Sequence, residues 1–116
     1  MSDVEQKTVT VTLSYYGGDD DPASGVFARR PVEPPFSHEL SFGVYLDDDS
    51  IGTPESLRDQ PLQIQLSGTA RALEAFGTYL LAMGALNSED PDVHEHFDDI
   101  PNDGGGPLHV IVRRRG

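Results

Sequence analysis

The 116-residue sequence predicts an α+β fold: a mainly antiparallel sheet of four or five strands with one long helix packed on one face. Several short segments alternate apolar and polar residues, which is the period of a half-buried strand. One segment after position 68 changes to the helical period, with apolar residues three and four positions apart. The length fits a single domain, residues 1–116, because one domain commonly has about 100 to 200 residues.

Four segments carry the strand pattern. In chain order they are residues 8–16, 39–46, 62–66 and 108–113. The first three alternate apolar and polar side chains, so each is expected to bury one face. The last is apolar at nearly every position, which is typical of a strand buried on both faces. We therefore expect the last segment to be a central strand.

The helical segment extends from Ala70 to Leu86. Its apolar residues Leu73, Phe76 and Leu80 recur at the helical period and fall on one face. We expect this face to be buried against the sheet together with Val110 of the last strand.

Three segments are expected to lie outside the regular elements. Residues 1–7 are polar and predicted to be disordered, and residues 17–37 form a long loop. That loop contains four prolines, which lack the N–H that a strand needs for pairing. Residues 87–106 are predicted to be an acidic loop or a short strand.

Acidic residues dominate the composition, with 20 Asp and Glu against 8 Lys and Arg and a net charge of −12. This charge argues against nucleic acid as a partner, because such binding needs cations to neutralise phosphates. It suits a basic protein partner, which an acidic surface would steer into place. A solvated surface, or a surface adapted to high salt, explains the same charge equally well.

Several classes of protein are not expected. The chain has no cysteine, so it offers no disulfide and no thiolate metal site. It has no long apolar stretch, so we expect a cytoplasmic protein with no contact to a membrane. No nucleophile motif or phosphate-binding glycine loop occurs, so we expect no enzymatic activity and no cofactor. The oligomeric state is not predicted.

The candidate site lies between the helix and the last strand. From Asp90 to Asp98 every second residue is Asp or His, and an extended chain would place them on one side. A short helix beginning at Asp90 would separate the two histidines instead. The histidines are interpreted as solvent-facing, as part of a protein contact or as metal ligands. The protein contact, with a second acidic cluster, would comprise Asp47, Asp48, Asp49, His94, Glu95, His96, Asp98 and Asp99. The metal ligands would be Asp92, His94, His96 and Asp98, since imidazole and carboxylate together bind zinc without thiolate.

The order of features from Leu62 to Arg114 is a strand, a Ser-Gly turn, a Leu-rich helix, the segment His94-Glu-His-Phe-Asp98, a glycine turn and a closing strand. In this order the C-terminal half resembles small bacterial immunity proteins of polymorphic-toxin systems, the thirty-second immunity family. The resemblance implies a non-enzymatic protein that binds and blocks a toxin. Many such toxins are basic nucleases, which an acidic inhibitor suits.

The sequence therefore predicts an acidic protein-binding module, an immunity-type inhibitor of a basic toxin. One alternative is a metal-binding protein or a small metal-dependent hydrolase that uses the Asp and His ligands above. The other alternative is a domain whose acidic surface is an adaptation to salt.

Overall fold

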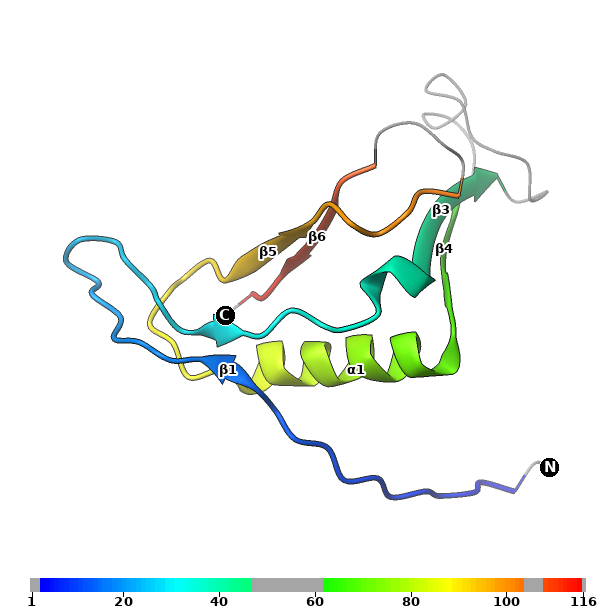
Figure 1. The fold of residues 1–116 in the computed structure, drawn as a ribbon, viewed down its shortest axis with the longest axis horizontal. Helices are drawn as coiled ribbons and strands as arrows, with labels where there is room; N and C mark the ends of the chain where they lie inside the picture. Colours follow the sequence, from blue (N-terminus) through cyan, green and yellow to red (C-terminus); the bar gives the residue numbers. More distant parts are fainter. Residues whose placement is uncertain (1–2, 47–61, 104–107, 116) are drawn as a thin grey trace.

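The computed structural model describes residues 3–46, 62–103 and 108–115, and it confirms the α+β class. Figure 1 shows the helix α1 (Ala70–Ala85) beside short pairs of strands. The strands are β1 (Tyr15–Tyr16), β2 (Arg30–Pro31), β3 (Leu40–Leu46), β4 (Leu62–Gly68), β5 (His94–Phe97) and β6 (Val110–Arg113). A 3-10 turn, η1 (Ser37–Glu39), leads into β3.

The expectation of a single sheet of four or five strands is wrong in its details. Within the described ranges the strands form three separate antiparallel pairs, β1–β2, β3–β4 and β5–β6. Backbone hydrogen bonds link β3 to the segment after β5: the Phe42 N–H donates to the Pro101 carbonyl at 3.0 Å, and the Asp103 N–H donates to the Phe42 carbonyl at 2.8 Å. The pairs are otherwise held together mainly by side chains that pack around one helix.

The last strand is shorter than predicted and is not central. In the described part of the chain β6 pairs with β5 alone, and half-buried and exposed residues alternate along it. Its inward side chains Val110 and Val112 pack against the core, whereas Ile111 faces away. Its apolar composition therefore reflects an uncovered outer face rather than burial on both sides.

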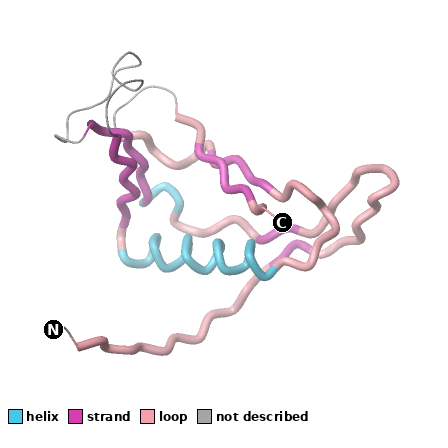
Figure 2. Tube along the Cα trace, turned by 180° about the vertical axis from the view of Figure 1, so that it is seen from behind, coloured by secondary structure: helices cyan, strands magenta, loops and turns pink. Residues whose placement is uncertain are grey.

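The strand predicted over residues 8–16 is also largely wrong. Only Tyr15 and Tyr16 form a strand, which pairs with β2. The preceding residues 3–14, named here the arm, run as an extended segment along α1 and away from it (Figures 1 and 2). The alternating pattern is present, but no described strand pairs with the arm, and a strand exists only where its backbone is paired.

The helix begins and ends close to its predicted bounds. The hydroxyl of Thr69 caps the N-terminus by accepting a hydrogen bond from the Ala72 N–H at 3.2 Å. Its opposite end stops at Leu86, whose backbone is extended.

The face of the helix that is buried differs from the predicted one. The large side chains that α1 and its C-cap bury are Phe76, Tyr79, Met83 and Leu86. Leu73 and Leu80 were expected to be buried, and they are 42% and 43% exposed. The helix is apolar on most of its circumference, and the face with two aromatic rings buries more area than the face with two leucines.

Aromatic rings form the centre of the core. The ring of Phe76 lies 6.0 Å from those of Tyr79 and Phe97 and 6.4 Å from that of Phe42, measured between centroids. Leu40 is fully buried beside them. These contacts join α1 to β3 and β5, so the helix is the element that positions the other parts.

Candidate protein-binding surface

Two acidic loops lie side by side at the end of the molecule where α1 finishes (Figures 1 and 2). One loop precedes β2 and the other follows α1, and the Ser88 hydroxyl joins them by donating to Asp20 at 3.1 Å. Between them is a hollow of about 380 Å³ lined by Asp19, Asp20, Arg29, Asn87, Ser88 and Glu89. We name the residues Asp19, Asp20, Asp21, Glu89 and Asp90 the acidic end.

Asp20 organises this surface. Its Oδ1 accepts hydrogen bonds from the backbone N–H groups of Ala28 at 2.9 Å and Arg29 at 3.2 Å. The bond from Arg29, followed by the hydroxyl of Ser88 and the N–H of Ala28, lowers the pKa of Asp20, although desolvation opposes the shift. The loop is therefore fixed by a carboxylate that stays ionised.

Two neighbouring carboxylates of the acidic end remain unpaired. Asp19 and Glu89 are exposed, and neither forms a hydrogen bond or ion pair with another described residue. Unpaired carboxylates at one end of a molecule create a negative potential that attracts cations from outside. Asp19 and Glu89 are 70 positions apart in the sequence, and folding places both on the lining of the same hollow.

The segment from Asp90 to Asp98 contains β5, so the extended interpretation is confirmed over residues 94–97. His94 and His96 share the outer face, with ring centroids 5.3 Å apart. Asp92 anchors this face by accepting from Arg113 Nε at 2.9 Å, and its other oxygen lies 3.5 Å from His94 Nδ1. The predicted contact residues His94 and His96 are thus exposed beside the acidic end.

Glu95 was expected on the same contact surface, but it points to the opposite face of β5. Its Oε1 is buried and has no hydrogen bond of normal geometry, and the same is true of the Tyr79 hydroxyl. Burial, and then the charge of Glu33, raise the pKa of Glu95. Burial and the charge of Glu95 raise the pKa of Tyr79. The alternation of a strand explains this correction, because residues 94 and 95 must face opposite ways.

Replacing this buried carboxylate should stabilise the protein at neutral pH. Because the folded pKa of Glu95 is raised above 4.5, its ionisation opposes folding, and stability is lost as the pH rises through that pKa. We expect Glu95→Gln to unfold at a higher urea concentration than wild type at pH 7, with the difference vanishing near pH 4. The exposed Asp98→Asn is the matched control and should not change the midpoint at pH 7. Equal midpoints for Glu95→Gln and wild type at pH 7 would contradict the assignment.

The remaining predicted contact residues are separated from this surface. Asp99 accepts a hydrogen bond from Ser37, and Asp98 is exposed just beyond the end of β5. The segment 87–106, predicted to be an acidic loop or a short strand, therefore contains β5, with Asp90 before the strand and Asp99 after it. Asp47, Asp48 and Asp49 lie outside the described residues.

The proposed metal ligands do not converge. Among the described residues, no group of three or more His, Asp or Glu side chains is placed to hold a metal ion. His94 and His96 share a face, but Asp92 is bonded to Arg113, and Asp98 lies beyond the end of β5. The metal interpretation of Asp92, His94, His96 and Asp98 gains no support.

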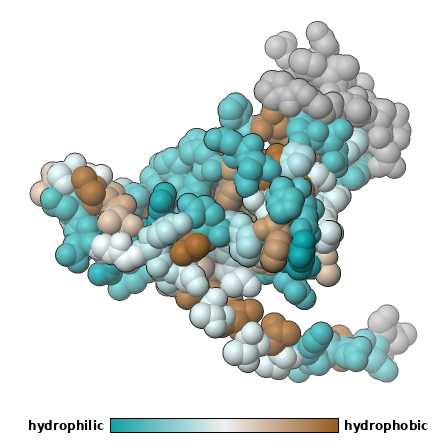
Figure 3. Space-filling view, in the orientation of Figure 1, coloured by the Kyte–Doolittle hydropathy of each residue, from teal (hydrophilic) through white to brown (hydrophobic). Residues whose placement is uncertain are grey.

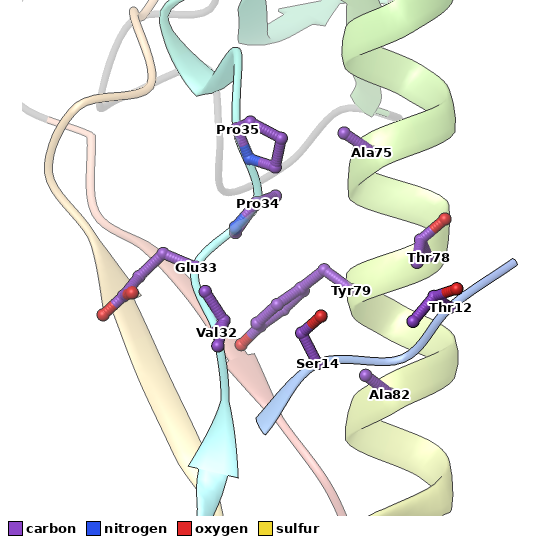
Figure 4. Close-up of a pocket in the computed structure, with 10 residues that line it drawn as sticks. All are labelled: Thr12, Ser14, Val32, Glu33, Pro34, Pro35, Ala75, Thr78, Tyr79 and Ala82. Atoms are coloured by element: carbon purple, nitrogen blue, oxygen red, sulfur yellow. The ribbon is translucent and has the colours of Figure 1, made fainter. Parts of the chain in front are cut away.

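A smaller hollow of about 260 Å³ lies between the arm, residues 32–35 and α1. Figure 4 shows the hydroxyl groups of Ser14 and Thr12 and the ring of Tyr79 along it, with Pro34 and Pro35 above. The carboxylate of Glu33 points away, where it accepts from the Tyr16 hydroxyl at 2.5 Å. The hollow thus presents hydroxyls, while the one carboxylate that lines it is paired elsewhere.

Comparison of the chain with models of protein families, with curated proteins and with solved structures finds no match in any of the three. None of the described helices has the length and apolar character that crossing a membrane requires. The geometry of the surface is therefore the main guide to function.

Proposed function

We propose that this chain is a non-enzymatic, acidic protein-binding module that binds and blocks a basic protein, in the manner of an immunity-type inhibitor and its toxin. The observation that carries the proposal is the acidic end. Two loops about 70 positions apart in sequence are held together there by the Ser88 to Asp20 hydrogen bond, and exposed carboxylates of both face solvent.

This surface has the properties that recognition of a cationic partner needs. Asp19 and Glu89 have no ion pair with described residues to satisfy before a partner's Lys or Arg could approach. The loop that carries Asp20 is fixed by its backbone hydrogen bonds, so less ordering is required on binding. The surface continues onto the outer face of β5, where His94 and His96 add polar contacts.

The proposal is tested by removing three charges from the acidic end. The variant carries Asp19→Asn, Asp21→Asn and Glu89→Gln, and its matched control carries Asp3→Asn, Glu74→Gln and Asp98→Asn, which change the net charge equally at dispersed sites. We expect immobilised wild-type protein to retain a basic protein from an extract of the native host, and that protein is then purified for the rate measurement. We expect its association rate to fall at least about tenfold with the first variant and less than about twofold with the control.

Equal effects of the two triple variants would contradict a localised binding surface. They would instead favour the alternative, a diffuse acidic surface adapted to salt. Retention of no basic protein would contradict the proposal outright. Where the retained protein is toxic to a bacterial host, co-expression of wild type should restore growth, and co-expression of the acidic-end variant should not.

A further inference from the structure

The outer edge of β4 is open in the described part of the chain. Both backbone groups of Phe42 bond to residues 101–103, so they point away from β4. Its partner in the antiparallel register is Leu66, whose N–H and C=O must therefore point away from β3. Ile64, two positions earlier, is oriented in the same way. The outward groups of Ile64 and Leu66 have no backbone partner among the described residues.

This edge also lacks the features that normally protect an edge strand. Proteins commonly place charged residues, proline or a bulge there, because an open edge recruits further strands. β4 contains none of these, although the chain carries 28 charged residues in total. The Ile64 side chain is 75% exposed and Leu66 is exposed as well. Both share the apolar face of the pair with Val44 and Phe42.

The arm has the complementary property. Residues 8–13 have the alternating pattern of a strand and no charge, and none of them forms a backbone hydrogen bond with a described residue, whereas the Ser14 carbonyl accepts one from the Val32 N–H at 3.0 Å. Val9 is 67% exposed, and a space of about 710 Å³ lies between the arm and α1. Apolar surface is visible along the arm in Figure 3. The arm is thus a segment with the pattern of a strand that has few backbone contacts with its own chain and leaves a space between itself and α1.

The two segments match one another in length, charge and pattern. β4 has seven residues, and the unpaired segment 8–13 has six. The arm and β4 lie well apart in Figure 1, so the arm does not cover this edge in its own chain. Two copies of an acidic chain repel one another. An interface formed by two uncharged strands allows the chains to come into contact without placing carboxylates opposite each other.

We propose that two copies of this chain exchange their arms, residues 8–13 of each adding as a strand to the open edge of β4 in the other. The exchange is reciprocal, so one twofold axis closes the assembly and leaves neither β4 edge exposed. Main-chain hydrogen bonds to Ile64 and Leu66 supply the pairing, and Val9 and Val11 extend the apolar face of the β3–β4 pair.

The test measures mass in solution and amide hydrogen exchange at about 0.15 M salt, where the Debye length is about 8 Å. We expect twice the 12.6 kDa mass of one chain. Ile64→Lys and deletion of residues 3–13 should each give monomers. Leu80→Lys introduces the same charge at another exposed aliphatic residue and should leave the dimer intact. The amides of Ile64 and Leu66 should exchange at least about tenfold more slowly in the wild-type dimer than in the monomer that lacks residues 3–13, whose α1 amides report that it is folded.

Three results would overturn the proposal. A wild-type monomer at all concentrations excludes the exchange. A monomer whose Ile64 and Leu66 amides are protected shows that a segment of the same chain covers the edge. A dimer that survives Ile64→Lys but is dissociated by Leu80→Lys places the interface on the exposed face of α1.

Discussion

Phe76→Ala is expected to lower the free energy of unfolding by about 3–5 kcal/mol, the usual cost of truncating a buried phenylalanine. The Phe76 side chain is 5% exposed, and its ring contacts those of Phe42, Tyr79 and Phe97. Those three rings belong to three different elements, so the cavity would disconnect β3 and β5 from the helix. The change is large against the total stability of a small domain, which is about 5–15 kcal/mol. Urea denaturation followed by circular dichroism measures it.

The matched control is Leu80→Ala on the same helix. Leu80 is 43% exposed, so its truncation removes less buried area and leaves no closed cavity. We expect a loss of about 1 kcal/mol or less, since substitutions outside the core are usually small. Similar losses for the two variants would show that the buried face of α1 is assigned incorrectly.

These two residues also show what the sequence can predict about the helix. Its period and the Thr69 cap locate α1 to within a residue or two, because both are local properties of the chain. Which face is buried depends on what packs against it. A helix with leucines on one side and aromatic rings on the other carries two apolar faces, and Phe97 and Phe42, distant in sequence, select the aromatic one.

The strands show the same limit. The alternation in residues 39–46 and 62–66 correctly predicted β3 and β4, which pair over seven residues. Equally clear alternation in the arm did not produce a strand, since pairing requires a neighbouring strand edge and the arm pairs with none of the described strands of its own chain. An alternating pattern predicts that a segment can form a strand. Whether the segment pairs depends on the positions of other segments of the chain.

The acidic end could not be located from the sequence, although all of its residues are visible there. Asp20 and Ser88 are joined only because the loop before β2 and the loop after α1 meet at the end of the helix. The side of β5 that carries His94 and His96 could be predicted, because alternation along an extended chain is local. The same alternation places Glu95 inside, which the grouping of neighbouring polar residues into one contact surface overlooked.

The three consecutive arginines near the C-terminus look equivalent in the sequence, and the structure separates them. Arg114 is half-buried, and its Nη1 donates hydrogen bonds to the carbonyls of Met83 at 3.1 Å and Leu86 at 2.7 Å. Its backbone N–H donates to Val93 at 2.9 Å. The carbonyls of a last helical turn have no partners within the helix, and a cation there also interacts favourably with the helix dipole.

Arg114→Met should therefore cost about 2–3 kcal/mol of stability, because it leaves two partly buried carbonyls without their charged donor while retaining most of the apolar stem. Arg113→Met is the control. Arg113 forms an exposed ion pair with Asp92, which contributes about 0–1 kcal/mol. The measurement is urea denaturation of both variants, with amide exchange at residues 84–86 as a local probe that should accelerate only in Arg114→Met. Equal destabilisation by the two substitutions would mean that the arginines act as a general basic tail. Faster exchange in Arg114→Met, confined to the end of α1, would identify Arg114 as the residue that holds this end of the helix against β6.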